Sequence, residues 1–445
     1  MQLVQICIEL YLEMGQLLSH PLTEKTIEYN DYKQFNRITE SSDCDGVLSV
    51  PRYFNCVGSM QGYRLTQEDA HLIINENRHS DIVYVKFYNP FENKQDNLKL
   101  SIFGVFDGHG NDECSNTLSG NHMKRHGKSP PNSTGSSHSK HEKLNNILSS
   151  STPTSELMRR GLAKWIVFNF EHHQYGAQDI TIEGKSFKRN FRTLEGLITQ
   201  VLKDSFLLED QELHKYFSRN SCGSTAVVAI IINDTNLYVA NSGDSRCILA
   251  SKSNGIKTMS FDHKPQHIGE LLRINDNGGT VSLGRVGGVL ALSRAFGDFQ
   301  FKRNVVYNSK FKVEGTHVKN NNTGLTEFVG TPPQESQVTV EPDILMHKIN
   351  YLRDEFLVLA CDGIWDIYSN KQVTKFIKYH LTLGMKLDTI MTKLLDHGIA
   401  QANSDTGIGF DNMTAIIIVL NKPGESLSDW HAKMKSRLER EKGLQ

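Results

Sequence analysis

The 445-residue sequence lacks the features that mark several large classes of protein. Its seven cysteines are scattered, odd in number and never spaced Cys-x-x-Cys, which argues against a disulfide framework or a zinc site and favours a reducing compartment. No apolar run reaches the roughly 18 to 20 residues that a membrane-spanning helix needs. Because 49 basic residues face 50 acidic ones, the net charge of −1 creates no field that attracts nucleic acid or an anionic membrane. We therefore expect a cytoplasmic protein, with the nucleus as a further location, that binds no nucleic acid.

A secretory leader is not expected, because Leu3–Leu18 carries two glutamates and no basic leading segment. The stretch from Met14 to Ser19 fits the pattern for N-myristoylation, but only if translation starts at Met14. Either it does, with Gly15 as the acylated residue, or the match is inert. A single acyl chain gives weak, reversible membrane contact, so stable membrane insertion is expected in neither case.

Two motifs of phosphate chemistry are lacking as well. Gly127-Lys128-Ser129 resembles the end of a P-loop, but His122 stands where the first glycine belongs and no strand precedes it. No Cys-x-x-x-x-x-Arg stretch exists, which argues against a cysteine-based phosphatase.

Polar segments interrupt an otherwise regular chain. Residues 112–154 and 304–331 are polar or lack periodicity, and both are predicted to be insertions. The core of the chain, 51–422, alternates strands with amphipathic helices and contains no repeat, so it is predicted to be one domain. Residues 1–50 form an N-terminal extension, and 423–445 are predicted to be a charged helical tail. Nothing in the sequence demands a second copy, and we expect a monomer.

Short apolar runs predict the strands of this domain. They are Leu100–Phe106, Thr225–Ile232, Leu237–Ala240, Arg246–Ala250, Glu355–Ala360 and Ala415–Leu420. The last two are nearly continuous apolar stretches, which indicates strands buried on both faces. Turn residues at Asn233-Asp234 and Asn254-Gly255 predict antiparallel hairpins.

Apolar stripes at helical spacing predict three helices. One begins at Leu194, one follows the capping box formed by Ser369 and Gln372, and one begins at Leu387. The pattern as a whole predicts buried sheets covered by helices.

Aspartates stand at one end of four strand-like runs. Asp107, Asp244 and Asp362 follow such runs, and Asp411 precedes one. One Asp-Gly pair alone would simply mark a turn, but four carboxylates converging at one mouth of a sheet sandwich would repel each other unless cations neutralise them. Oxygen ligands without a nearby Cys or a paired His select Mg²⁺ or Mn²⁺.

Sequence motifs surround these aspartates in a fixed order. They are Met60-Gln61-Gly62-Tyr63-Arg64, Glu68-Asp69-Ala70-His71, Phe106-Asp107-Gly108-His109-Gly110, Ser221-Cys222-Gly223-Ser224-Thr225-Ala226, Asn241-Ser242-Gly243-Asp244-Ser245-Arg246, Asp262-His263-Lys264-Pro265, Leu290-Ala291-Leu292-Ser293-Arg294-Ala295-Phe296-Gly297-Asp298, Cys361-Asp362-Gly363-Ile364-Trp365-Asp366 and Asp411-Asn412-Met413-Thr414. From about Asn55 to Leu420 the chain resembles the protein phosphatase 2C family, and the residues after Met14 are similar to the beginnings of its fungal members. Asn111 departs from the pattern, since a glycine is common there, and the first insertion begins at once where the family usually continues into a helix.

The resemblance implies an α+β fold, a four-layer α-β-β-α sandwich of two mainly antiparallel sheets flanked by helices. It implies a metal-dependent serine/threonine protein phosphatase, in which two Mn²⁺ or Mg²⁺ ions activate water against a phosphate ester. Asp107 would bridge the two ions, the carbonyl of Gly108 would add a ligand, and Asp362 and Asp411 would complete the pair.

Further residues take supporting roles by the same resemblance. Glu68 and Asp69 would act through water on the metals, and Asp244 and Asp366 would hold a third, weaker ion. Arg64 would grip the phosphate, with a surface ion pair as the alternative role. His109 would be the general acid, with the orientation of a water molecule as the alternative role. Because two divalent ions outweigh the charge of three aspartates, the site would keep positive charge for a phosphate dianion.

The resemblance also implies phosphoprotein substrates, with stress-activated MAP kinases as candidates by analogy with fungal relatives. Two other functions stay open. One is a catalytically inactive member that binds partners through the same fold, although a scaffold does not need three repelling carboxylates. The other is a two-metal hydrolase that acts on a phosphodiester or a small metabolite.

Overall fold

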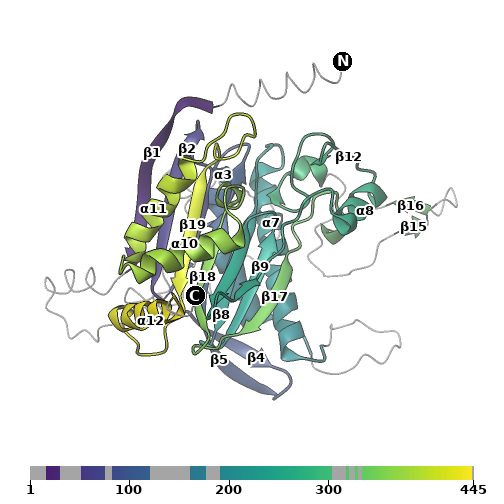
Figure 1. The fold of residues 1–445 in the computed structure, drawn as a ribbon. Helices are drawn as coiled ribbons and strands as arrows, with labels where there is room; N and C mark the ends of the chain where they lie inside the picture. Colours follow the sequence, from purple (N-terminus) through teal and green to yellow (C-terminus); the bar gives the residue numbers. More distant parts are fainter. Residues whose placement is uncertain are drawn as a thin grey trace, which may run out of the picture.

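Two antiparallel sheets, stacked face to face, form the centre of the molecule (Figure 1). The computed structural model describes residues 17–30, 52–75, 83–120, 161–176, 191–302, 317–319, 326–328 and 333–442. The candidate acylation site at Gly15 lies outside this range, as does most of both predicted insertions. Within this range, every helix is too short or too polar to cross a membrane.

The first sheet contains the first and the last strand of the described chain. Its strands, in spatial order, are β1 (Leu17–Asn30), β2 (Asn55–Arg64), β19 (Met413–Val419), β18 (Asp354–Ala360), β10 (Arg246–Ser251) and β11 (Ile256–Thr258). β1 pairs with β2 along most of its length, so part of the predicted N-terminal extension is an edge strand of the domain.

The second sheet is built around one long strand, Lys94–Phe106. In order, its strands are β17 (Asp343–Lys348), β9 (Asn236–Ser242), β8 (Ala226–Ile232), β5 (Lys94–Phe106) and β3 (Ala70–Ile74), and β4 (Val83–Asn89) pairs with the first half of β5. The predicted hairpins are confirmed: β8 pairs with β9, and β10 with β11, in antiparallel register. The chain crosses from the second sheet to the first between β9 and β10, which places Asp244 at the corner.

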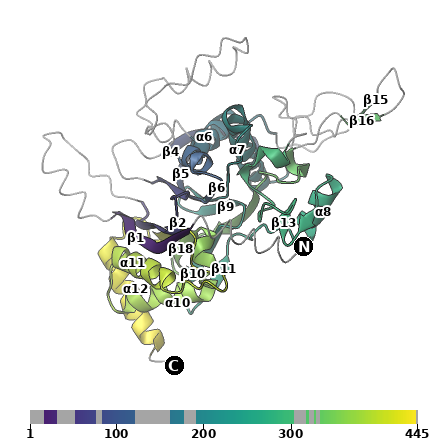
Figure 2. The same ribbon diagram turned by 90° about the horizontal axis from the view of Figure 1, so that it is seen from above.

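Helices cover both outer faces of the sandwich, as the view from above shows (Figure 2). On the second sheet lie α6 (Gly161–His172) and α7 (Leu194–Phe217); on the first lie α10 (Asn370–Thr382), α11 (Leu387–Ile399) and α12 (Leu427–Lys442). The predicted helices at Leu194, Ser369 and Leu387 are confirmed, and the Ser369 capping box is present. The predicted four-layer fold is therefore the observed one.

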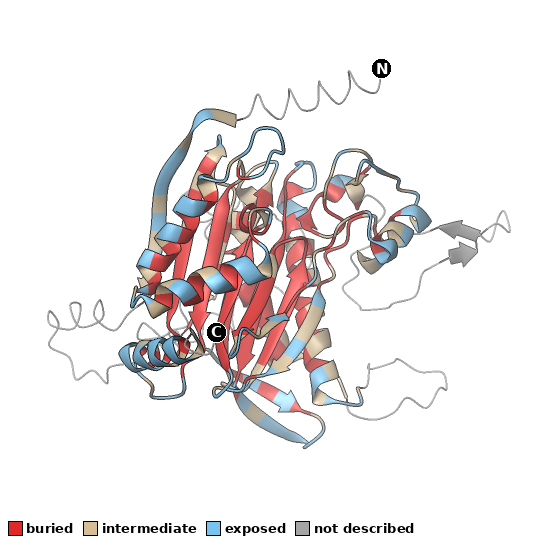
Figure 3. Ribbon diagram, in the orientation of Figure 1, coloured by how far each residue is buried: buried red, intermediate tan, exposed pale blue. Residues whose placement is uncertain are grey.

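Three apolar layers hold this sandwich together (Figure 3). β8 illustrates the principle, because all seven of its residues are buried: Val228 and Ile230 pack under the helices, while Val227 and Ala229 face the other sheet. Alternate residues of a strand point to opposite faces, so only a continuous apolar run can fill both layers.

The predicted C-terminal tail is a helix, and it is part of the core. Trp430 and Met434 of α12 are each 1% exposed and pack with the residues under α10 and α11. Opposite them, Glu355 of β18 pairs with Lys378 of α10 at 2.8 Å and with Arg437 of α12, so buried ionic contacts also join the helix to the sheet.

Smaller elements surround one end of the sandwich. They are β6 (Gly108–His109), β7 (Gly223–Ser224), β14 (Phe296–Gly297), α3 (Glu113–Leu118), α8 (Ile268–Asp276), α9 (Asp362–Trp365), the hairpin β12 (Val281–Ser282) and β13 (Arg285–Val286), the hairpin β15 (His317–Lys319) and β16 (Thr326–Phe328), and the 3₁₀ turns Phe299–Phe301 and Pro333–Glu335. The expectation that the chain skips a helix after the Asp107 motif is wrong, because α3 stands there. Asn111 explains this, since its side-chain oxygen accepts the backbone N–H of Glu113 at 2.9 Å and so supports the first turn.

Candidate metal centre

Antiparallel pairing brings the predicted aspartates to one end of the sandwich. The end of β18 lies beside the start of β19, since Ala360 pairs with Ala415, so Asp362 and Asp411 are neighbours. In the other sheet Phe106 pairs with Ala70, which sets Asp107 beside Asp69.

As a result, two sets of side chains have ligand atoms close enough together to hold a metal ion. Oxygens of Asp107, Asp244 and Asp362 all lie within 4.8 Å of one another, and so do oxygens of Asp69 and Asp107 with the sulfur of Cys361. Asp107 belongs to both sets.

Loss of solvent and then mutual repulsion raise the pKa of these carboxylic acids. For Asp107, burial is the largest cause, followed by the charges of Asp362 and Asp69, and the pKa lies well above its usual range. The pKa of Asp362 is also far above normal, because of burial and then Asp244 and Asp411. Burial raises the pKa of Asp69 to about 7. The fold thus holds several carboxylates where each opposes the ionisation of the next.

Two cations offset only part of this charge. Lys264 pairs with Asp244, and although burial alone would lower its pKa, Asp244 raises it. Arg64, at the end of β2, donates from a guanidinium nitrogen to Oδ2 of Asp411 at 2.7 Å, while its side chain stays 46% exposed. Asp411 therefore lies close to the cluster but is paired with Arg64. This contact corresponds to the alternative role considered for Arg64, a surface ion pair.

The remaining predicted ligands differ in exposure: Gly108 is buried, Glu68 is partly buried and Asp366 is exposed. Glu68 accepts a hydrogen bond from the hydroxyl of Thr66 at 3.0 Å, and partial burial raises its pKa. Asp366 is exposed after α9, where partial loss of solvent and then Asp244 raise its pKa despite the opposing charge of Lys264. Gly108 packs so closely on the backbone oxygen of Glu68 that a β-carbon there would collide with it.

Cys361 touches the cluster without the properties of a nucleophile. Its thiol is buried, donates to the carbonyl of Asn412 and accepts the N–H of Thr414 at 3.1 Å. Burial, and then the charges of Asp69 and Asp107, raise the pKa of this thiol well above its usual range, so it stays neutral.

His109 lies on a small sheet beside the cluster. β6, β7 and β14 pair in antiparallel fashion, and His109 opposes Gly223. Its Nε2 lies 2.7 Å from Oδ2 of Asp298. Burial acts to lower the pKa of His109, but Asp298 outweighs it and the net shift is upward.

Sequence reasoning gave no role to three residues that shape this site. Asp298 holds His109, Lys264 neutralises Asp244, and Asn412 accepts the backbone N–H of Glu68 at 2.9 Å and donates to the carbonyls of Gln61 and Thr66. All three lie within the sequence motifs quoted above, so their position in a motif is the signal that could have identified them as site residues.

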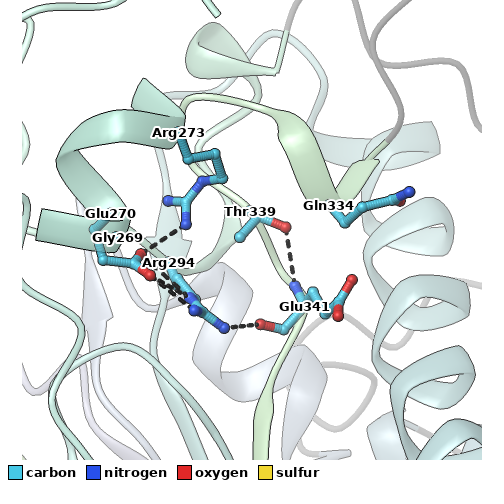
Figure 4. Close-up of a pocket in the computed structure, with 7 residues that line it drawn as sticks. All are labelled: Gly269, Glu270, Arg273, Arg294, Gln334, Thr339 and Glu341. Carbon is cyan, nitrogen blue, oxygen red and sulfur yellow. Dashed lines mark hydrogen bonds and ion pairs between the residues drawn. The ribbon is translucent and has the colours of Figure 1, made fainter. Parts of the chain in front are cut away.

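A separate cavity of about 280 Å³ lies beside α8 (Figure 4). Its arginines are already engaged: Arg294 and Arg273 both bind Glu270 at 2.7 Å, and Arg294 also reaches Asp343 at 2.9 Å. Although burial opposes it, these arginines lower the pKa of Glu270 to about 2. The cavity therefore presents paired charges rather than a binding site for phosphate.

The comparisons with known proteins agree with this geometry. The family model described as protein phosphatase 2C matches residues 161–407. "Protein phosphatase 2C homolog 4" of Saccharomyces cerevisiae is 63% identical over 433 residues, covering 97% of this chain and 100% of the relative. "Protein phosphatase 2C homolog 2" of Aspergillus flavus is 31% identical, covering 92% of this chain and 68% of the relative. A crystal structure of a phosphatase from Toxoplasma gondii shares the fold, with a TM-score of 0.51 at 19% identity over 89% of this chain and 96% of that one.

The fold and the acidic cluster define an enzyme of the phosphatase class. The chain belongs to the protein phosphatase 2C family, and it is a protein-serine/threonine phosphatase.

Proposed function

We propose that the acidic cluster holds two Mn²⁺ or Mg²⁺ ions and that the enzyme is a metal-dependent phosphatase for phosphoserine and phosphothreonine. Asp107, Asp362, Asp411 and the carbonyl of Gly108 are the direct ligands, and Glu68 and Asp69 act through water. Asp244 and Asp366 take a third, weaker ion. Bound divalent ions would supply the Lewis acidity that activates water against a phosphate ester.

The observation that carries this proposal is the state of the carboxylates without a cation. Asp107 and Asp362 lie close together and partly buried; loss of solvent and the charge of Asp362 raise the pKa of Asp107, and loss of solvent and the charges of Asp244 and Asp411 raise that of Asp362. Oδ2 of Asp69 is buried with no hydrogen-bond partner in the described part of the chain. Groups left in this state cost stability unless a ligand satisfies them. The donors are carboxylates, and the one nearby thiol is protonated, so hard divalent ions fit the site.

Arg64 and His109 act on the substrate. The half-exposed guanidinium of Arg64 can move one of its hydrogen bonds from Asp411 to a phosphate oxygen, which suits its planar fork of donors. The upward shift of the pKa of His109, caused by Asp298 against the effect of burial, favours the protonated ring. Since Asp298 occupies Nε2, the proton at Nδ1 is the one available to the departing serine or threonine oxygen.

The substrates we propose are phosphoproteins, with stress-activated MAP kinases as the first candidates, and the enzyme acts as a monomer in the cytoplasm or nucleus. If Gly15 is acylated, contact with membranes is weak and reversible. The kinase assignment follows the resemblance to fungal relatives and is tested by dephosphorylation of purified phospho-kinases.

The decisive experiment is a phosphopeptide assay with EDTA and with added Mn²⁺, in which Asp107→Asn and Asp362→Asn are compared with the natural chain. We expect activity only with metal, and a loss in both variants of roughly 10²-fold or more. A phosphodiester assayed beside the peptide separates the proposal from a general two-metal hydrolase. Activity that survives chelation refutes the mechanism, and no activity in any condition favours an inactive, partner-binding member of the family.

A further inference from the structure

Two buried thiols meet behind the small sheet that carries His109. The sulfurs of Cys114 and Cys222 lie 3.1 Å apart, although the residues are separated by 108 positions, and both side chains are 0% exposed. Both cysteines are free. We propose that this pair is a site of oxidative modification, where a hydroperoxide converts the two thiols into an intramolecular disulfide that lowers phosphatase activity.

The pair differs from the other cysteines of the described chain. The thiols of Cys56 and Cys361 donate to backbone carbonyls, and Cys247 is buried among apolar side chains of the central layer. A disulfide requires two thiols that lie close together. Among the cysteines of the described residues, only Cys114 and Cys222 meet this requirement.

Each thiol has a distinct part in the reaction. The hydrogen bond between the two thiols lowers the pKa of Cys222, and the same contact, with burial, raises the pKa of Cys114 well above its usual range. Cys222 is therefore the sulfur that attacks the peroxide, which breaks the O–O bond, gives a sulfenic acid at Cys222 and releases one water. The thiol of Cys114 then displaces hydroxide from that sulfur, so that a second water leaves and the S–S bond forms. Two thiols are oxidised and one molecule of hydrogen peroxide is reduced.

Neighbouring contacts connect this reaction to the active site. Cys222 directly precedes β7, which pairs with His109, and its carbonyl accepts the N–H of Asp298 at 3.0 Å. On the other side, a β-carbon at Gly297 would lie 3.0 Å from the sulfur of Cys114, so the thiol pair packs against the turn that presents Asp298. Bond formation draws α3 and β7 together and so displaces the partners of His109. Misplacement of a catalytic group on the ångström scale costs up to about 10²-fold in rate.

Burial of the two thiols limits which oxidants can reach them and how fast they react. Because both thiols are buried, only a small oxidant can reach them, and oxidation should be slower than that of an exposed thiol. Cys114 lies on a helix of six residues, too short to be stable without its tertiary contacts, so brief local opening of α3 gives the route of entry.

The test treats the full-length, Mn²⁺-loaded enzyme with hydrogen peroxide, removes the oxidant, and returns the protein to fresh Mn²⁺ buffer. Peptides are then mapped without reduction by mass spectrometry, and phosphopeptide hydrolysis is measured before and after dithiothreitol. We expect a Cys114–Cys222 cross-linked peptide that grows in step with a loss of activity of about tenfold or more, and full recovery with dithiothreitol. Diamide, which oxidises thiols without peroxide chemistry at a metal, should give the same product.

Three variants make the result decisive. Cys114→Ala and Cys222→Ala should each abolish the cross-link and the reversible loss, while Cys247→Ala, which removes a buried thiol without a thiol partner, should respond as the natural chain does. If one member of the pair fails to fold, the other and the peptide map of the natural chain still decide the question. The proposal is overturned if the cross-linked peptide does not form, if it forms without loss of activity, or if either variant loses activity reversibly to the same extent. Because the peptide map does not depend on catalysis, failure here is distinct from failure of the proposed metal mechanism.

Discussion

The imidazole Nε2 of His109 lies 2.7 Å from the carboxylate Oδ2 of Asp298, although 189 positions separate the two residues. Asp298 is 1% exposed and has a left-handed backbone (φ +50°), as does Gly297 before it (φ +70°). Such a conformation is costly for a residue with a side chain and persists only where surrounding structure enforces it. Here it aims a buried carboxylate at the proposed general acid.

We therefore predict that Asp298→Asn moves the alkaline limb of the pH–rate profile to lower pH. Asp298 raises the pKa of His109, and a general acid loses its proton as pH rises through that pKa, so loss of the carboxylate makes activity fall earlier. The measurement is kcat/KM for a phosphopeptide across pH, with p-nitrophenyl phosphate as control. Its leaving group needs little protonation, so the rate with this substrate should drop less; equal losses with both substrates would mean that Asp298 has only a structural role.

Asp107→Asn should stabilise the metal-free protein while it removes activity. The side chain is partly buried among like charges, and the amide removes the repulsion that Asp362, Asp69 and Asp411 exert on a charged Asp107. The melting temperature in EDTA should rise, and the increase on adding Mn²⁺ should shrink. As a control, Asp210 is 1% exposed and paired with Lys302 at 3.0 Å, so Asp210→Asn should lose about 3 to 5 kcal/mol with or without metal.

The stabilisation by Mn²⁺ should grow as pH rises from 5.5 to 7.5. In the metal-free protein the folded state binds more protons than the unfolded state at Asp69, whose pKa is raised to about 7, and at Asp107 and Asp362. Stability without metal is therefore lost as pH rises toward those values, whereas a bound cation replaces the protons. Melting curves in EDTA and in Mn²⁺ at both pH values give the result. Glu209 has a raised pKa of about 7 away from the cluster, so Glu209→Gln should leave the metal-dependent difference unchanged.

Gly223→Ala should impair catalysis more than folding. A β-carbon at Gly223 would collide with Nε2 of His109 and Oδ2 of Asp298, so the new methyl group must separate the pair. We expect a loss in kcat of about 10²-fold. Gly269→Ala is the control, because a β-carbon there meets nothing within 4 Å and the helix α8 should gain about 0.5 to 1 kcal/mol. Normal activity of Gly223→Ala would show that the pair does not act in the reaction.

Trp430→Ala should destabilise the whole domain, by about 3 to 5 kcal/mol. The indole is 1% exposed and fills the layer between α12 and the first sheet, so its loss opens a cavity in the core. Urea unfolding provides the measurement. Lys433→Ala on the same helix removes a side chain that is 41% exposed and pairs with Glu425, and it should change stability by less than about 1 kcal/mol. A small effect of Trp430→Ala would mean that α12 is the independent tail that its composition predicts.

The sequence was most informative where a local rule has one structural solution. The apolar runs at β18 and β19 predicted fully buried strands because only a strand in a central layer buries every residue of such a run. The Ser369 capping box likewise predicted the start of α10. The same reasoning failed for α3, where composition suggested an insertion and a single side chain, Asn111, supports a helix start.

What the sequence by itself determined is the strands β5, β8, β9, β10, β18 and β19, the helices α7, α10 and α11, and the aspartates at strand ends, because the periodicity of buried side chains and the residues of turns are encoded locally. Only the tertiary structure decided which carboxylates become neighbours: antiparallel register joined Asp69 to Asp107 and Asp362 to Asp411, and the corner after β9 added Asp244. It also decided the pairs that no local rule contains, His109 with Asp298 and Cys114 with Cys222. Contacts between distant segments depend on how whole layers pack. The local spacing of apolar residues along a strand or helix does not specify that packing.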